Sequence, residues 1–325
     1  MKYAVIGTSG IAKEFVAAAE GSGLVLVGVC SRSAGRGAAF ADEIGQPGLP
    51  VFVGLDALAA AQDIDAVYVA SPNICHFEQC KKILQTGKHV LCEKPLTLSP
   101  HQLTELQSLA AEQGLILMEA IMYLHTPMRH AVWEALPCLG RIRSVQIDFS
   151  QRSSRLNRLL AGEMPNVFNP TLGGGALNDL GVYCVYPLLD FFGEPEAVIA
   201  SHLRYDSPGA ADTSGTALLH YRDFDAALSW SKAGQSRGVS QIIGENGTLS
   251  IGSISQFQGV TLYDREGNAT LLNDPMSKVE VMRYEAAAFY RQCHSQTNEV
   301  SYETASELAL RVNRWMENIR LGNAL

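Results

Sequence analysis

The sequence predicts a two-domain α/β protein, in which a doubly wound parallel sheet is followed by an α+β domain with an open, mostly antiparallel sheet. Three observations lead to this prediction. The chain has 325 residues, more than one hydrophobic core of about 250 to 300 residues usually holds. Apolar runs alternate with amphipathic stretches up to about residue 119, and strand-like runs follow one another later. We expect the domains to cover residues 1–120 and 121–325.

The first domain is expected to form a parallel sheet covered by helices on both faces, because short apolar runs and amphipathic stretches alternate along it. The expected strands are residues 2–7, 24–31, 51–53, 66–71, 89–92 and 115–118. The expected helices are residues 10–20, 35–44, 55–60, 75–85 and 100–113. Six strands with five crossovers complete a doubly wound unit.

The second domain is expected to be a sheet flanked by helices. Helices are predicted near 125–136, from the glycine-rich turn 173–175 to about 192, and over 279–294 and 302–320. The expected strands are 142–152, 197–205, 215–221, 226–232, 239–244, 248–251 and 260–263. Asn246 and Gly247 predict a hairpin turn with positive φ angles. An apolar free face would need cover, so we expect a homodimer or a higher homo-oligomer.

Composition narrows the class of partner. A formal net charge of -8 without a long Lys/Arg run argues against nucleic acid and favours a small-molecule substrate. No apolar run approaches the roughly 18 to 20 residues that span a bilayer, and Lys13 and Glu14 come too early for a signal peptide. Seven cysteines without a C-x-x-C pair suit a reducing compartment. We expect a cytoplasmic protein, and the histidine spacing predicts no metal site.

A glycine-containing loop follows the first predicted strand. Residues 7–12 fit the pattern G-x-G-x-x-A except that Ser9 replaces the middle glycine. Gly7 would permit the tight turn, and the amides of Ser9, Gly10 and Ile11 would face a pyrophosphate at the positive end of the next helix. The spacing alone also fits an ordinary strand-to-helix turn. Its place between a strand and a helix favours a Rossmann dinucleotide site.

The end of the second strand bears on which cofactor binds. A site that prefers NAD usually offers a carboxylate to the adenosine ribose there. Here Ser31 is followed by Arg32, and Arg36 lies one helical turn later. Guanidinium groups would neutralise a phosphorylated ribose, which predicts NADP rather than NAD, with NAD still possible. The alternative is a pair of solvated surface arginines.

Two polar motifs follow the fourth and fifth strands, at the carboxyl ends where ligands bind in such sheets. One contains Ser71, Asn73 and His76, and the other is Glu93-Lys94 before a proline. Both runs resemble the Gfo/Idh/MocA family, named for glucose-fructose oxidoreductase and inositol dehydrogenase. The resemblance continues through residues 173–183 and 118–121. A tyrosine at position 183, where many relatives have histidine, is similar to the branch of glucose-fructose oxidoreductase and dimeric dihydrodiol dehydrogenase.

The residues of the expected site have alternative interpretations when each is taken alone. Lys94 could be a surface lysine. Asp179 and Tyr183 are four residues apart and would share one helix face, where they could address one ligand, or Tyr183 could pack in the core. The resemblance implies that Lys94 and Tyr183 act together in proton transfer and that Asp179 orients the substrate or the lysine.

The resemblance also assigns the cofactor side of the site. It implies that Ser71, Asn73, His76, Glu93 and Lys94 contact the cofactor, although His76 could instead cap a helix. The implied activity is hydride transfer between a nicotinamide and a hydroxylated carbon of a sugar, polyol or dihydrodiol.

The substrate and two other functions stay open at this point. Polar residues between 150 and 172 suit a polyol or equally a solvated loop: Arg152, Arg155, Arg158, Asn166 and Asn169. One alternative is a redox-assisted glycosidase that holds NAD tightly. The other is a nonenzymatic nucleotide sensor on the same fold. Retention of Lys94, Asp179 and Tyr183 favours an enzyme.

Overall fold

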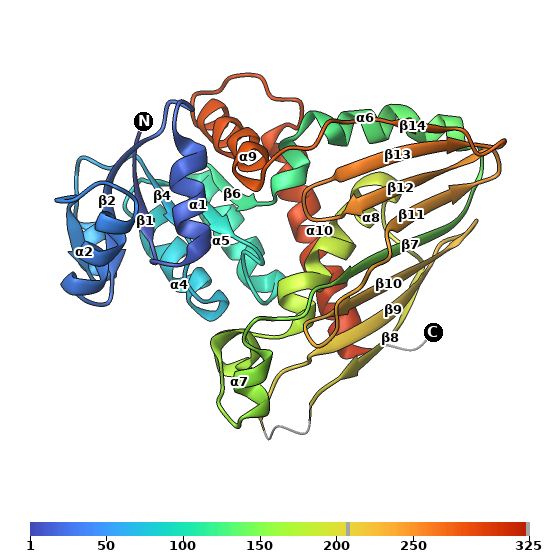
Figure 1. The fold of residues 1–325 in the computed structure, drawn as a ribbon. Helices are drawn as coiled ribbons and strands as arrows, with labels where there is room; N and C mark the ends of the chain where they lie inside the picture. Colours follow the sequence, from blue (N-terminus) through green and yellow to red (C-terminus); the bar gives the residue numbers. More distant parts are fainter. Residues whose placement is uncertain (206–208, 323–325) are drawn as a thin grey trace. The chain divides into compact units, whose positions relative to one another are not determined.

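The computed structural model describes residues 1–205 and 209–322 of the chain, and it contains two compact units (Figure 1). The first unit consists of Met1–His125 together with Ser277–Glu307. The second consists of Thr126–Met276 together with the chain from Leu308 onward. Each unit is built around one sheet, as the sequence predicts.

The sheet of the first unit has six parallel strands in the order β3-β2-β1-β4-β5-β6. This is the doubly wound arrangement that the alternating sequence predicts, and it is confirmed. The last strand starts two residues later than expected, because the amide of Leu115 still bonds to the carbonyl of Ala110 at the helix end. The strands are β1 (Lys2–Ile6), β2 (Val25–Ser31), β3 (Val51–Val53), β4 (Ala66–Val69), β5 (His89–Glu93) and β6 (Leu117–Ala120).

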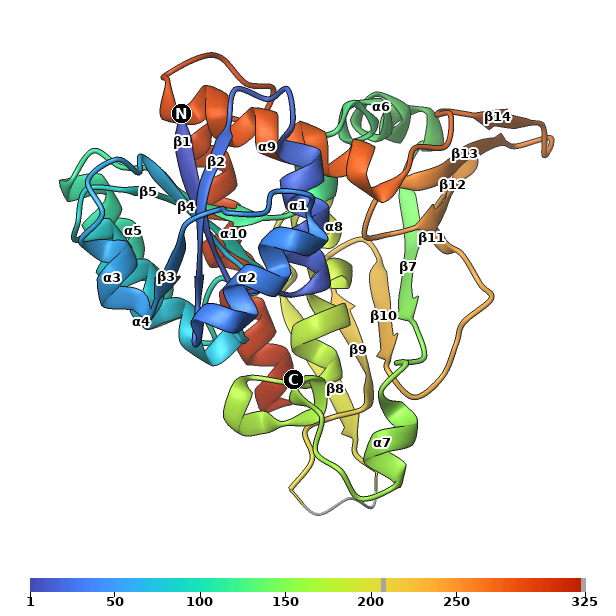
Figure 2. The same cartoon turned by 60° about the vertical axis from the view of Figure 1, so that its left-hand side comes forward.

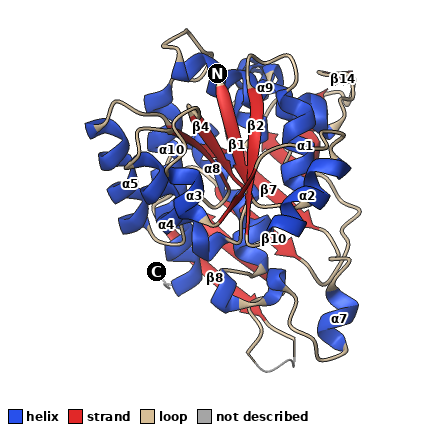
Figure 3. Ribbon diagram, turned by 90° about the vertical axis from the view of Figure 1, so that its left-hand side faces the viewer, coloured by secondary structure: helices blue, strands red, loops and turns tan. Residues whose placement is uncertain are grey.

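Helices cover both faces of this sheet. Figures 2 and 3 show α1 and α2 on one face and α3, α4 and α5 on the other. Phe15 of α1 stacks on Tyr68 of β4, with ring centroids 3.9 Å apart, and both side chains are buried. The helices of the first unit are α1 (Gly10–Ala19), α2 (Ala34–Glu43), α3 (Leu55–Ala59), α4 (Asn73–Leu84), α5 (Pro100–Glu112), η1 (Met122–His125) and α9 (Lys278–Cys293).

Helix α9 belongs to this first unit, although its sequence lies far beyond the expected boundary at residue 120. It packs against α1, and Lys278 at its start pairs with Glu14 of α1 at 2.6 Å. The ring of Tyr290 lies against Gly23, where a Cβ would be 2.6 Å from the ring. Residues 277–307 therefore complete the core of the first unit.

The second unit contains an eight-stranded sheet in the order β14-β13-β12-β11-β7-β10-β9-β8. Strands β7 and β10 run parallel and the other neighbours are antiparallel, which confirms the mostly antiparallel sheet. Its strands are β7 (Ile142–Ser150), β8 (Ala197–Leu203), β9 (Ser214–His220), β10 (Asp225–Ser231), β11 (Ser240–Gly244), β12 (Gly247–Ser253), β13 (Gln258–Asp264) and β14 (Ala269–Leu271).

One strand and one turn differ from the prediction. Strand β14 is missed because its three residues are all exposed and carry no alternating pattern. The predicted hairpin joins β11 to β12. Neither Asn246 nor Gly247 has a positive φ, so the prediction of positive φ angles in this turn is wrong. The last paired residues are Ile243 and Thr248, and this wider loop does not need a left-handed residue.

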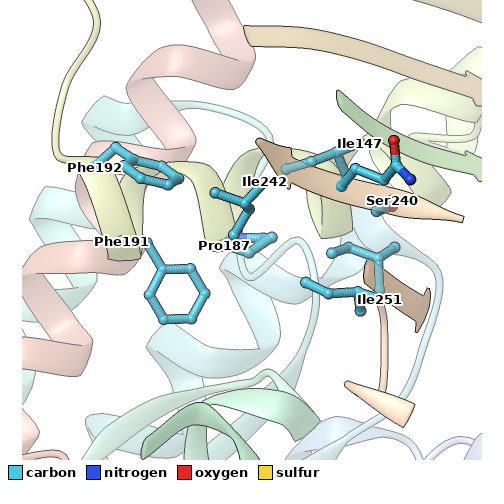
Figure 4. Close-up of a pocket in the computed structure, with 9 residues that line it drawn as sticks. Ile147, Pro187, Phe191, Phe192, Ser240, Ile242 and Ile251 are labelled. Carbon is cyan, nitrogen blue, oxygen red and sulfur yellow. The ribbon is translucent and has the colours of Figure 1, made fainter. Parts of the chain in front are cut away.

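Helix α8 (Val182–Phe192) is buried along almost its whole length and packs on strands β7 and β10. It is preceded by a π-helical turn, η5 (Leu177–Gly181), rather than by the continuous helix predicted from residue 173. Between α8 and the sheet lies a small apolar pocket, where Pro187, Phe191 and Phe192 face Ile147 and Ile242 (Figure 4). This packing fixes the helix on the sheet.

Shorter helices connect these elements. They are α6 (Pro127–Ala135), η2 (Leu136–Leu139), α7 (Leu156–Leu160), η3 (Asn166–Phe168) and η4 (Pro170–Leu172). The long helix α10 (Tyr302–Leu321) closes the described chain. Across residues 1–205 and 209–322, no helix has the length and apolar character needed to cross a membrane.

A carboxyl group without a hydrogen-bond partner lies inside the first unit. Glu285 of α9 is fully buried, and neither of its carboxyl oxygens is bonded to another described group. Burial raises the pKa of Glu285 well above its usual range, and nearby Glu93 raises it further. The folded protein therefore holds a proton at this position that the unfolded chain releases near its ordinary pKa of about 4.5.

We expect Glu285→Gln to stabilise the protein at pH 8 and to be neutral below about pH 4. Because the folded pKa is raised, the native state binds the extra proton, and wild-type stability falls as pH rises above the unfolded value. The expected gain at pH 8 is roughly 1 to 3 kcal/mol, since one pKa unit corresponds to about 1.4 kcal/mol. Urea unfolding at the two pH values measures it.

Glu280→Gln is the matched control on the same helix. Glu280 forms a capping box with Ser277, and bonds to Ser277 lower the pKa of Glu280. The ionised Glu280 side chain therefore contributes to stability at neutral pH, and this contribution is lost on acidification. We expect Glu280→Gln to lose stability at pH 8. Equal behaviour of the two variants would contradict the assignment.

Candidate cofactor and proton-transfer site

The loop between β1 and α1 fits close approach by a phosphate group. Gly7 has φ 107°, and a Cβ there would lie 2.5 Å from the carbonyl oxygen of Ala70. Ser9 is the N-cap of α1 but its side chain makes no capping hydrogen bond, and its hydroxyl lies 3.5 Å from the oxygen of Ala70. The first-turn amides therefore receive no cap from Ser9, and Ala12 is fully buried, which lets α1 pack closely on the sheet.

Gly7→Ala is expected to destabilise the protein by about 2 to 4 kcal/mol, because the new Cβ meets backbone at a φ that L residues avoid. Thermal unfolding without cofactor measures this effect. Gly10→Ala is the control: no atom lies within 4 Å of its Cβ position, so the change should stay within about 0.5 kcal/mol. Equal unfolding temperatures for Gly7→Ala and wild type would contradict the expectation.

Two arginines flank the end of β2. Arg32 and Arg36 are exposed, on either side of Ser33, which is the N-cap of α2. The hydroxyl of Ser31 donates to the carbonyl of Ser33, and the amide of Ser33 donates back to that hydroxyl at 3.3 Å. This local turn fixes the backbone that carries Arg32. Arg32 directly follows β2 and Arg36 lies in the first turn of α2, so both residues belong to the strand end where an adenosine ribose would be bound.

The motif after β4 is tied together by hydrogen bonds. The hydroxyl of Ser71 donates to Gln79 at 2.6 Å, and Asn73 begins α4 after the N-cap Pro72. His76 is fully buried, with Nδ1 2.9 Å from the carbonyl of Pro95 and Nε2 3.0 Å from the carbonyl of Ser71. Burial lowers the pKa of His76, against the effect of these two bonds.

Both ring nitrogens of His76 lie within hydrogen-bond distance of backbone carbonyls, one at each of the two predicted motifs. Since burial favours the neutral ring, which carries one N–H, the ring donates to one of these two carbonyls. His76 thus links the segment after β4 to the segment after β5, and its expected contact with the nicotinamide stays a prediction.

The motif at the end of β5 is held by residues of the two neighbouring strands, β4 and β6. Glu93 accepts a hydrogen bond of 2.5 Å from the hydroxyl of Tyr68, and burial raises the pKa of Glu93. The amide of Leu96 donates to Glu119 at 2.8 Å, and the peptide bond between Lys94 and Pro95 is cis. Lys94 is half-buried between these fixed neighbours. Because β1, β4 and β5 are adjacent and parallel, their carboxyl ends bring Gly7, Ser71 and Lys94 to one edge of the sheet.

The second unit contributes Asp179 and Tyr183 from one helical segment. Asp179 lies in the π-helical turn η5, and Tyr183 lies in the first turn of α8, which follows it directly. Such π-helical turns occur frequently at functional sites. Tyr183 is 9% exposed and its ring packs edge-on against Phe149, with centroids 5.5 Å apart. The carboxylate of Asp179 pairs with the ammonium of Lys232.

Several supporting residues could not be found by sequence reasoning. Asp212 caps η5 by accepting from the amide of Leu177 at 2.8 Å, and Arg320 donates to Asn178 at 2.9 Å. Burial raises the pKa of Asp212 and lowers that of Arg320. Lys232 was expected only as the last residue of a strand. Nothing in the local sequence signals these partners, since each lies more than thirty residues from η5.

The polar segment after β7 is partly self-contained. Arg152 donates to Asn157 at 2.6 Å, and Arg158 pairs with Glu163 at 2.6 Å. Asn169 caps η4 through the amide of Thr171, and Asn166 lies in η3, whereas Arg155 precedes α7. Arg152, Arg158 and Asn169 are thus each bonded within the segment.

Two protein-family models match this chain. Residues 1–121 match the oxidoreductase family with an NAD-binding Rossmann fold, and residues 138–250 match the GFO/IDH/MocA C-terminal domain. The NADP(+)-dependent scyllo-inositol 2-dehydrogenase IolU of Bacillus subtilis (strain 168) is 35% identical over 98% of this chain and 96% of its own. The uncharacterized oxidoreductase YgjR of Escherichia coli (strain K12) is 37% identical over 89% of this chain and 87% of its own.

The whole fold has a solved counterpart. The structure of KijD10, a 3-ketoreductase from Actinomadura kijaniata in complex with NADP and TDP-benzene, superimposes with a TM-score of 0.85 at 26% identity. The match covers 99% of this chain and 97% of that one. Both halves of the chain, in the order that the motifs predicted, are thus accounted for by one group of enzymes. The chain belongs to the Gfo/Idh/MocA oxidoreductase family.

Proposed function

We propose that this protein is an NADP-dependent dehydrogenase or reductase that acts on a CH-OH group of a sugar, polyol or dihydrodiol. One observation carries the proposal: in a chain of this family, the phosphate-type loop at Gly7 and the Lys94 motif lie at the same edge of the parallel sheet. That arrangement suits a dinucleotide whose pyrophosphate binds at α1 and whose nicotinamide reaches the end of β5.

The residues of the first unit fit the cofactor. The α1 amides of Ser9, Gly10 and Ile11 would bind the pyrophosphate, because the helix N-terminus carries partial positive charge and Gly7 permits the tight turn against Ala70. Ser31, Arg32 and Arg36 would bind the phosphorylated ribose, which favours NADP. The relative IolU is named as NADP(+)-dependent and KijD10 was solved with NADP, in agreement with this preference. Ser71, Asn73, His76, Glu93 and Lys94 would contact or position the nicotinamide side.

The chemistry divides between the cofactor and the chain. When bound, the nicotinamide supplies or accepts the hydride. Tyr183 would donate or accept the proton of the reacting oxygen, and Lys94 would stabilise negative charge that develops on that oxygen. Asp179 would accept a hydrogen bond from a substrate hydroxyl. The ordinary pKa of a phenol is about 10, so a cation near Tyr183 would make it a better base.

We also propose that the protein works in the cytoplasm as a homo-oligomer. All seven cysteines are free, which suits a reducing compartment. The outer face of the second unit's sheet bears apolar side chains toward both edges: Ile199, Leu218 and Leu271 are 46%, 45% and 56% exposed. Such a face is typically covered by a second copy. Sedimentation analysis tests this, and a monomer at all concentrations would contradict it.

A substrate screen with two cofactors tests the proposed activity. Sugars, polyols including scyllo-inositol, and diols are offered with saturating NADP or NAD, and absorbance of the reduced nicotinamide is followed. We expect turnover of at least one hydroxylated compound, and NADPH binding at least about 10-fold tighter than NADH, since a 2′-phosphate paired with arginine adds more than about 1.4 kcal/mol. Tighter binding of NADH would contradict the cofactor preference.

The same screen separates the two alternatives. Release of nitrophenol from aryl glycosides without net change in the cofactor would indicate the redox-assisted glycosidase. Cofactor binding without turnover of any compound would indicate the nucleotide sensor.

A further inference from the structure

Lys232 follows strand β10 directly and has a backbone fixed on both sides. Its amide donates to the carbonyl of Thr213 at 2.7 Å, and its carbonyl accepts from the amide of Ser153 at 2.9 Å. The neighbouring hydroxyl of Ser231 accepts from the amides of Ala233 and Gly234 at 3.1 and 3.0 Å. The backbone of Lys232 is therefore held by hydrogen bonds to two neighbouring segments and by the turn that follows it.

The side chain of Lys232 is directed to a single carboxylate. Its ammonium donates to Oδ2 of Asp179, and only 7% of its side chain is exposed. The side chain of Asp179, in contrast, is 38% exposed. The buried lysine thus holds the carboxylate from the protein side while the carboxylate keeps exposed surface.

The segment that carries Asp179 is fixed independently of this pair. Asp212 caps the start of η5 at Leu177, and Arg320 and the carbonyl of Gly173 bind the side chain of Asn178. A Cβ on Gly181 would lie 3.2 Å from the ring of Trp230, so the end of the turn packs closely on β10. The backbone of η5 is thus held by contacts that do not involve Lys232.

A buried ammonium is costly where only packing is required. Taking a charge out of water costs several kcal/mol, about what a well-formed partner returns, and an apolar residue of similar volume is often as stable or more so. A buried lysine aimed at a partly exposed carboxylate is therefore better explained by orientation than by stability.

We propose that Lys232 is a positioning residue of the active site, which holds the Asp179 carboxylate in the orientation that receives a substrate hydroxyl. The proposal rests on the proposed dehydrogenase function. It adds a residue from the end of β10 to the expected set of Lys94, Asp179 and Tyr183. Lys232 acts through Asp179 and does not itself need to touch the substrate.

A double-mutant cycle tests the proposal. The kcat with NADP and scyllo-inositol, or with the fastest compound of the screen, is measured for wild type, Lys232→Met, Asp179→Asn and the double variant. We expect Lys232→Met to lower kcat about 10- to 100-fold in the wild-type background and less than about 2-fold in the Asp179→Asn background, because residues that act as a unit are not additive. Lys232→Arg, which keeps the charge, should recover most of the lost kcat.

Controls separate positioning from folding. The Kd of NADPH should be unchanged in Lys232→Met. Lys88→Met removes another buried lysine, whose ammonium lies 3.1 Å from the carbonyl of Ala59, and should leave kcat unchanged. If Lys232→Met does not fold, Lys232→Gln takes its place in the cycle, since it keeps a donor without the charge.

Each outcome decides between the claims. Wild-type kcat in Lys232→Met, or an equal loss in both backgrounds, would overturn the positioning role while leaving the dehydrogenase proposal intact. Absence of turnover by the wild-type protein on every compound would overturn the dehydrogenase proposal, and the positioning role with it. A loss of kcat without recovery in Lys232→Arg would also count against the role of charge.

Discussion

Lys94→Met is expected to lower kcat by about 10³-fold or more, while NADPH binding weakens by less than about 10-fold because Lys94 is one of several groups expected to contact the cofactor. Lys94 follows β5 in a turn fixed through Glu93, Tyr68 and Glu119, so a methionine can occupy the same path without altering the strand end. The loss follows because the variant has no cation to stabilise the charge that develops on the substrate oxygen. Steady-state kinetics and an NADPH titration of the same preparation measure the two effects separately.

Lys81→Met provides the matched control for Lys94. Lys81 lies on α4 in the same unit, and its ammonium pairs with Glu105 of α5 at 2.6 Å on the surface. Its loss should leave kcat unchanged and change stability little, because exposed ion pairs contribute weakly. Wild-type kcat in Lys94→Met would remove Lys94 from the mechanism.

Tyr183→Phe is expected to lower kcat by about 10²- to 10⁴-fold, the usual contribution of a positioned acid or base. The phenylalanine ring keeps the edge-on contact with Phe149 and the burial of the segment, so the fold should tolerate the change. Only the hydroxyl is removed. Kinetics in both directions of the reaction measure the effect.

Tyr221→Phe is the control for loss of a hydroxyl in the second unit. The hydroxyl of Tyr221 donates to the carbonyl of Gly193 at 3.0 Å and has no place in the proposed chemistry. That variant should lose about 1 kcal/mol of stability and keep its kcat. If Tyr183→Phe turned over substrate as fast as Tyr221→Phe, the tyrosine would not be the proton donor.

The first unit's sheet could be predicted closely because its strands are buried on both faces and appear as apolar runs between amphipathic helices. The packing of α9 in the first unit could not be predicted. Its pattern is that of an amphipathic helix, and nothing local shows that its apolar face packs on α1, more than 250 residues earlier. Contacts of this range are set by the tertiary fold.

The site divides in the same manner. Gly7, Lys94, Asp179 and Tyr183 could be predicted as site residues because they stand in runs with a recognisable order along the chain. The groups that bond to Glu93, Asp179 and Leu177 could not be predicted, since Tyr68, Lys232 and Asp212 come from other strands or loops and carry no local pattern. For His76 the motif could be recognised in the sequence, but only the structure shows that its ring nitrogens lie 2.9 and 3.0 Å from two backbone carbonyls.

The most direct test of the mechanism is a crystal structure of the protein with NADP and a substrate from the screen. The account predicts that Lys94 Nζ and Tyr183 Oη both lie within hydrogen-bond reach, about 2.6 to 3.2 Å, of the oxygen on the reacting carbon. The nicotinamide ring should face that carbon from the end of β5. A complex in which the two groups contact different parts of the ligand, or in which Tyr183 stays packed away from it, would contradict the mechanism.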